Sequence, residues 1–184
     1  MIESAQKPRS IVLIGPMAVG KTTLGAELAR QLDREFRDSD QAIEKQYGRI
    51  SEIFASRGES WFRQVEARTI AGLLALAEPY VLSLGGGAVL DTGTQQLLRG
   101  HTVVYLSATV DDVRARILRS TTRPLLQGED AVQRWQKLAE ARQCVYQRLA
   151  TVTLPVKGRN AQELAKVLLA QLDDLKNVEQ EEIP

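Results

Sequence analysis

The sequence predicts an α/β fold in which helices flank a doubly wound parallel sheet of about five strands. Short apolar runs bounded by turn residues alternate along the chain with longer stretches whose apolar residues recur at helical spacing. Runs of this kind, rich in β-branched residues and without polar alternation, are typical of strands that helices cover on both faces. Strands that alternate with helices favour parallel pairing.

The elements follow one another in a regular order. The first strand is expected at 11–14, where the run Ile-Val-Leu-Ile ends at Gly15, and a helix is expected to follow it through a glycine-containing loop. Thr109 and Asp112 are expected to cap a later helix. Further strands are expected near residue 36, at 80–84, at 103–106 and, from a weaker pattern, at 151–156. Helices are expected at 21–32, 51–57, 60–77, 110–119, 131–149 and 160–175.

Composition excludes several classes of protein. The chain has 184 residues, and its 24 Lys and Arg against 23 Asp and Glu leave almost no net charge, so a nucleic-acid-binding surface is not indicated. Cys144 is the only cysteine, which rules out an intrachain disulfide framework and suits a reducing cytoplasm. No apolar run approaches the ~20 residues of a membrane span. We expect a single cytoplasmic domain over 1–184, monomeric and without a membrane partner.

A phosphate-binding loop is the strongest single signal in the chain. The motif G-x-x-x-x-G-K-[ST] lies between the first expected strand and the first expected helix, which is the context that it requires. Lys21 would contact the β and γ phosphates of a nucleotide, and the Thr22 hydroxyl would ligate the Mg²⁺ that bridges them. The motif therefore predicts binding of ATP with Mg²⁺. The residues expected at the nucleotide are Gly15, Ala18, Val19, Gly20, Lys21, Thr22 and Thr23.

Two carboxylates, Asp38 and Asp40, follow the first helix. In an extended segment, side chains two residues apart point to the same side, so both acids could face the phosphates from the end of the second strand. One acid could serve the metal, while the other could hold the acceptor hydroxyl and take its proton. Position favours Asp40 as the acid on the acceptor side. The alternative is a solvated turn with a helix cap at Asp40.

A paired arginine and a run of glycines lie further along the chain. Arg63 and Glu66 are three residues apart, so on a helix the carboxylate can hold the guanidinium as a receptor for a substrate carboxylate; the alternative is an ordinary surface pair. Gly85, Gly86 and Gly87 follow an apolar strand directly, and three consecutive glycines would destabilise the interior of a strand or helix. Its place at the carboxyl end of a strand predicts close approach of a ligand.

A polar segment at about 120–130 interrupts the helical pattern and is expected to be a mobile lid. Its Arg123 could meet phosphate charge while the closing loop excludes water. Arg142, on the next expected helix, is either a substrate anchor or a solvated charge, and spacing alone favours the latter. The acidic, aperiodic stretch at about 177–184 is expected to be a disordered tail.

In their order along the chain, these motifs resemble the shikimate kinases, over a span from about Ser10 to Leu172. Each motif alone is modest, but their joint order is highly specific. The resemblance rests on the phosphate loop, Asp38-Ser39-Asp40 with Ile43-Glu44, Ile53-Phe54, Gly58-Glu59, Phe62-Arg63, Gly85-Gly86-Gly87-Ala88-Val89, Arg123-Pro124-Leu125-Leu126, and Arg142 with Tyr146.

The resemblance implies a P-loop kinase fold and transfer of the ATP γ-phosphoryl group to the 3-hydroxyl of shikimate, in the pathway to chorismate and the aromatic amino acids. It implies a substrate-binding helical segment at about 38–66, with Asp38 on the magnesium side. Asp40 would bind shikimate hydroxyls and act as candidate base. The other implied roles are Arg63 and Arg142 at the shikimate carboxylate, Gly85, Gly86 and Gly87 as backbone contacts to shikimate, Lys21 and Arg123 at the transferring phosphate, and Arg116 against adenine.

Two positions depart from the family pattern. Ala18-Val19 replaces the small, glycine-containing pair that is more usual before Gly20. Arg159-Asn160-Ala161 lacks the proline expected in an adenine-contacting loop.

Two rival functions stay open at this point. A related sugar-acid kinase, such as gluconate kinase, shares the size and the phosphate loop, although the acid pair, Phe62-Arg63 and the triple glycine speak against it. A nucleotide-binding module without turnover is the alternative from another class. The presence of Lys21, Thr22, Arg123 and both acids argues for activity.

Overall fold

The structure, a computed structural model, describes residues 9–119 and 130–181. The expected lid at about 120–130, with Arg123, therefore lies outside the described residues except for Asp130. Within the described part of the chain, no helix is long and apolar enough to span a bilayer.

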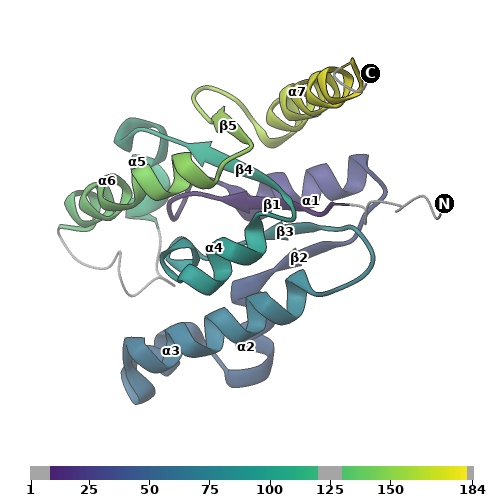
Figure 1. The fold of residues 1–184 in the computed structure, drawn as a ribbon. Coiled ribbons are helices and arrows are strands. Elements are labelled where there is room, and N and C mark those ends of the chain that lie inside the picture. Colours follow the sequence, from purple (N-terminus) through teal and green to yellow (C-terminus); the bar gives the residue numbers. More distant parts are fainter. Residues whose placement is uncertain (1–8, 120–129, 182–184) are drawn as a thin grey trace.

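Five parallel strands form one sheet within the described residues, in the order β2-β3-β1-β4-β5. The central strand β1 is the Ile-Val-Leu-Ile run that the sequence predicts, and it pairs with β3 on one side and β4 on the other. The expected α/β fold with about five parallel strands is confirmed (Figure 1). The strands are β1 (Ile11–Ile14), β2 (Phe36–Asp38), β3 (Val81–Ser83), β4 (Thr102–Ser107) and β5 (Val152–Pro155).

Alternate residues of β1 enter different cores. Ile11 and Leu13 belong to a cluster packed on one face of the sheet, and Val12 and Ile14 belong to a cluster on the other face. All four residues are buried, because successive side chains of a strand point to opposite faces and helices cover both of them.

Helices on the first face include α1 and α7, and those on the second include α3 and α4. The sequence does not predict α4, and it places α2 only within the helical segment that the resemblance implies at about 38–66. Both are short helices that begin after an aspartate cap, Asp38 and Asp91 respectively. The helical elements are α1 (Lys21–Gln31), α2 (Ser39–Tyr47), α3 (Ile50–Leu74), the single-turn η1 (Ala88–Leu90), α4 (Thr92–Leu98), α5 (Val110–Leu118), α6 (Ala131–Leu149) and α7 (Ala161–Glu181).

Helix α3 contains the two helices expected at 51–57 and 60–77. Gly58 interrupts it with φ 78° and ψ 170°, a conformation outside the helical region that glycine adopts easily. The sequence therefore identified a real break, although the helix resumes at once and its second part ends at Leu74, three residues earlier than expected.

The expectation of a disordered tail from 177 is wrong for its first part, since α7 continues to Glu181. Glutamate and glutamine make up most of the stretch 177–181, and both residue types favour a helix. The loss of apolar periodicity therefore did not mark the end of the helix.

Helix α6 contacts both cores. Trp135, near its start, belongs to the same cluster as α1 and α7, whereas Tyr146, three turns later, belongs to the cluster with α3 and α4. Because one helix reaches both faces, α6 passes across the edge of the sheet, where the loops after β1 and β3 lie.

Candidate active site

The phosphate loop connects β1 to α1, as the sequence predicts. Gly15 has φ 139°, and a Cβ at this position would lie 2.6 Å from the carbonyl oxygen of Leu106, so only glycine fits. The Lys21 ammonium group lies across the loop and donates to the carbonyl oxygens of Gly15 and Pro16, at 2.9 and 2.8 Å. Lys21 is buried. Its charge is therefore already held where a phosphate would enter.

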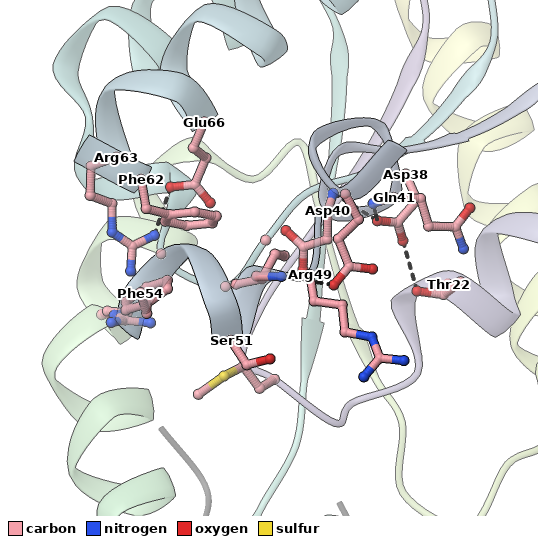
Figure 2. A pocket seen from close by; sticks show the side chains of 17 residues that line it. Thr22, Asp38, Asp40, Gln41, Arg49, Ser51, Phe54, Phe62, Arg63 and Glu66 are labelled. Carbon is pink, nitrogen blue, oxygen red and sulfur yellow. Dashed lines mark hydrogen bonds and ion pairs between the residues drawn. The ribbon is translucent and has the colours of Figure 1, made fainter. Parts of the chain in front are cut away.

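Thr22 and Asp38 meet across the gap between α1 and β2. The Thr22 hydroxyl donates to Oδ2 of Asp38 at 2.9 Å (Figure 2). The other carboxylate oxygen of Asp38 accepts from the backbone N–H groups of Asp40 and Gln41, which caps α2. One carboxylate thus fixes the start of α2 against the phosphate loop.

The expectation that Asp38 and Asp40 share an extended segment is wrong. Asp38 ends β2, whereas Asp40 already lies in the first turn of α2, because capping by Asp38 starts the helix at Ser39. The alternative of a cap at Asp40 is also wrong, since Asp38 is the cap. Both side chains nevertheless line the same cavity, as Figure 2 shows.

The Arg63–Glu66 pair is present and partly buried. Nη1 of Arg63 donates to Oε2 of Glu66 at 2.6 Å, and Glu59 contacts the same guanidinium from the other side. The Glu66 side chain is only 3% exposed. Burial raises the pKa of Glu66, and the charge of Asp40 adds to this, while Arg63 and Arg142 oppose it. The pair is therefore part of a buried charge cluster and not a surface ion pair.

Gly85 brings the two acids of this cluster together. A Cβ at Gly85 would lie 2.7 Å from Oδ1 of Asp40 and 2.7 Å from Oε1 of Glu66. Only a residue without a side chain leaves room for both carboxylates, which is the close approach that the glycine run predicts. At Gly87, the group that approaches is the Arg63 guanidinium.

Arg142 of α6 faces the same cavity and is 8% exposed. The interpretation of Arg142 as a solvated helix charge is therefore wrong. Tertiary packing is the reason, because α6 passes over the carboxyl ends of the strands and so buries this side chain. Tyr146, one turn further, donates to the carbonyl oxygen of Gly86. Burial raises the pKa of Tyr146 to about 12, and the phenol is protonated at neutral pH, as a phenol at the usual value of 10 is.

The cavity has a volume of about 750 Å³ and joins the phosphate loop to the charge cluster. Figure 2 shows Thr22, Asp38 and Asp40 on one side of it and Arg63 and Glu66 on the other. The sequence analysis did not assign Glu66, Arg49 or Met17 to the lining of this cavity. For Glu66, the three-residue spacing to Arg63 could have predicted it. The lining includes Met17, Thr22, Asp38, Asp40, Arg49, Arg63, Glu66, Gly85, Gly86, Gly87 and Arg142.

Of the residues expected near the adenine base, Arg116 lies beside the phosphate loop, whereas Asn160 caps a helix. Arg116 of α5 lies beside the start of α1, with Nη1 3.2 Å from where a Cβ of Gly20 would be. Asn160, in the segment that lacks the expected proline, caps α7 by accepting from the Glu163 N–H at 3.0 Å. Thr23 is exposed in the first turn of α1.

The donor set near the phosphate loop suits Mg²⁺. Thr22 and Asp38 offer hard oxygen atoms, and Mg²⁺ in kinases takes one or two protein oxygens, with phosphates and water completing its shell. Among residues 9–119 and 130–181, no group of three or more His, Cys, Asp or Glu could hold a metal by itself.

A model of the shikimate kinase family matches residues 17–173. The chain belongs to the shikimate kinase family. It is 42% identical over 164 residues to the shikimate kinase of Streptomyces avermitilis, covering 89% of this chain and 95% of that one. Identity to the shikimate kinase of Rhodococcus erythropolis is 40% over 169 residues, covering 91% and 99%. The family expected from the motifs is confirmed, and with it an ATP-dependent small-molecule kinase.

Solved structures agree with this family. The shikimate kinase of Acinetobacter baumannii in complex with shikimate matches with a TM-score of 0.88 at 36% identity, covering 93% of this chain and 96% of that one. A gluconokinase from Sinorhizobium meliloti matches with a TM-score of 0.67 at 21% identity, covering 96% and 99%. At that identity the second likeness shows the fold alone.

Proposed function

We propose that this shikimate kinase family member transfers the ATP γ-phosphoryl group to the 3-hydroxyl of shikimate, giving ADP and shikimate 3-phosphate. The observation that carries the proposal is one cavity that joins the phosphate loop, Asp40 and the side chains of Arg63 and Arg142. An acceptor with one carboxylate and several hydroxyls needs cations and an acid in the same pocket as the phosphate donor. The relative that was solved with shikimate supports this acceptor.

Lys21 and the loop backbone would hold the β and γ phosphates. Mg²⁺ supplies charge neutralisation on those phosphates when it is bound with ATP, and Thr22 and Asp38 are the residues that would hold it. The hydrogen bond between Thr22 and Asp38 keeps the two oxygens together beforehand. Arg116 would lie against adenine, and Arg123 would reach the transferring phosphate.

Arg63 and Arg142 would bind the shikimate carboxylate. Arg142 is buried and the Arg63 side chain is 27% exposed, which limits competing water, and Glu66 fixes the direction in which the Arg63 guanidinium points. Asp40 would accept a hydrogen bond from the acceptor hydroxyl and take its proton during transfer. The backbone of Gly85, Gly86 and Gly87 would lie against the ring, since these three residues line the cavity.

Most of the catalysis would then come from positioning and electrostatics, as in other phosphoryl transfers.

The chain has a single cysteine and therefore no pair that could form an intrachain disulfide, which supports the prediction of a cytoplasmic enzyme. The monomeric state stays a prediction from the sequence.

The first experiment measures ADP release with ATP, Mg²⁺ and shikimate, gluconate or no acceptor. We expect turnover with shikimate only, and a fall in kcat of about 10²- to 10⁴-fold in Asp40→Asn, because the amide cannot take the proton. The KM for ATP should stay close to that of the wild type. Turnover with gluconate instead of shikimate would overturn the proposed acceptor, and an active Asp40→Asn variant would overturn the role of Asp40.

A further inference from the structure

Ala18, in the middle of the phosphate loop, has φ 64°. This is the left-handed region, which costs free energy in any residue with a Cβ and which glycine adopts freely. The sequence departs from the usual pattern at this residue, where Ala18-Val19 replaces a glycine-containing pair. Some contact must therefore hold the loop in this conformation.

Trp135 of α6 provides such a contact. Its indole Nε1 donates to the carbonyl oxygen of Met17 at 2.7 Å, across 118 positions of sequence. The indole is 2% exposed and belongs to the core cluster that includes Val19, with Met17 and Ala18 packed against it. Packing against this cluster therefore fixes the position of the donor, although the side chain also lines a neighbouring cavity.

The hydrogen bond sets the orientation of one peptide unit. In a trans peptide, the C=O of Met17 and the N–H of Ala18 point in opposite directions, and the described residues contain no cis bond. With the carbonyl held toward Trp135, the Ala18 N–H points away from α6. Phosphate loops bind their ligand through backbone N–H groups, so the direction of this N–H affects affinity for phosphate.

We propose that Trp135 is a positioning residue for nucleotide binding: its indole N–H holds the Met17–Ala18 peptide in the phosphate-binding orientation and offsets the strain at Ala18. Trp135 itself does not contact substrate in this proposal. The inference rests on the proposed use of the loop for ATP. Val19 completes the arrangement, because its burial at 1% exposure ties the same turn of the loop to the core.

A double-mutant cycle tests the proposal with Trp135→Phe, Ala18→Gly and the combined variant. Phenylalanine keeps an aromatic ring in the core but lacks the N–H. We expect Trp135→Phe to raise the dissociation constant for ATP about five- to tenfold and to leave the KM for shikimate unchanged. In the Ala18→Gly background the left-handed conformation costs little, so adding Trp135→Phe should then change the constant less than about twofold.

Trp61→Phe is the matched control, since Trp61 packs in α3 away from the loop, and its ATP affinity should equal that of the wild type. An equal loss of affinity in the wild-type and Ala18→Gly backgrounds would overturn the inference, and so would an equal loss for both substrates. If the wild type binds ATP and Trp135→Phe binds it equally well, only the inference fails. If the wild type does not bind ATP, the proposed function fails.

A second measurement applies if Trp135→Phe does not fold. In ¹⁵N-labelled wild-type protein the chain gives two indole N–H signals, which Trp61→Phe assigns. The Trp135 signal should exchange slowly with solvent and should shift when a non-hydrolysable ATP analogue is added. A signal that exchanges rapidly or does not shift would overturn the proposal.

Discussion

At the scale of single residues, burial decides which charges can bind substrate. Arg142 is 8% exposed and Glu66 is 3% exposed, so neither group is fully solvated. A buried guanidinium offers two parallel N–H donors whose direction is fixed, and this geometry matches a carboxylate better than a lysine ammonium does. The Arg63–Glu66 contact at 2.6 Å shows how such a direction is set.

Replacing Arg142 by lysine tests this geometry. Arg142→Lys keeps the charge but loses the fork, so the KM for shikimate should rise about tenfold or more while the KM for ATP stays the same. Arg148→Lys, on the same helix but exposed, is the control and should leave both constants unchanged. A parallel rise of both KM values in Arg142→Lys would instead indicate a distorted fold. Steady-state kinetics with each substrate varied separately measures the effect.

At the scale of elements, caps fix where helices begin. Asp112 accepts from the N–H and the hydroxyl of Thr109, at 2.8 and 2.7 Å, and so completes the capping box that the sequence predicts for α5. These hydrogen bonds, that of the Thr109 hydroxyl first, hold the pKa of Asp112 below its usual value. At α2 the N-cap residue itself, Asp38, accepts from the backbone N–H groups of Asp40 and Gln41, and this starts the helix and turns Asp40 toward the cavity.

The cap at Asp112 makes a prediction that depends on pH. A depressed pKa means stability that is present above the unfolded-state pKa and is lost as pH falls through the folded-state value. Asp112→Asn should lower the free energy of unfolding at pH 7 by about 1 kcal/mol, or roughly 2 to 4 °C in Tm. The difference from the wild type should shrink as the pH falls below the usual Asp value of 3.8.

Thermal unfolding at several pH values measures this effect. Asp111→Asn is the matched control, because Asp111 lies in the same turn but only forms an exposed contact with Arg114 at 3.6 Å. A difference between Asp112→Asn and the wild type that stays constant into acid would contradict the role of the ionised carboxylate. So would an equal effect in the control.

At the scale of the whole molecule, the parallel sheet brings distant segments together. The ends of β1, β2 and β3 lie at one edge, and α6 reaches across that edge to hold both loops, through Trp135 at Met17 and Tyr146 at Gly86. The residues proposed to bind the two substrates therefore come together although they lie on different elements.

Ligand-induced stabilisation tests this separation of subsites. At about a hundredfold excess over its dissociation constant, each substrate should stabilise the fold by about 2.7 kcal/mol, or roughly 5 to 10 °C in Tm. Lys21→Ala should abolish the shift caused by ATP with Mg²⁺ and keep the shift caused by shikimate. Loss of both shifts would contradict separate subsites, and a shift with gluconate equal to that with shikimate would contradict the proposed acceptor.

The sequence by itself determined the α/β class, the strand positions and the phosphate loop. These features depend on local signals: apolar runs for buried strands, helical periodicity, and a glycine-bounded motif between a strand and a helix. The break near Gly58 and the cap at Thr109 belong to the same group, because a backbone conformation or a hydrogen bond within four residues decides them. The order of the motifs also predicted the family.

Only the tertiary structure decided which charges are buried and which groups share the cavity. Helical spacing favoured a solvated Arg142, but the packing of α6 over the sheet buries this side chain. The local sequence of α6 cannot predict that the helix contacts the loop after β3, as it does through Tyr146 and Gly86. Asp38 and Asp40 lie in different elements because the Asp38 side chain caps a helix that begins at Ser39, so the strand does not continue to Asp40. The hydrogen bond from Trp135 to Met17 joins residues 118 positions apart in the sequence. Such a contact forms only when the folded sheet brings α6 and the phosphate loop together.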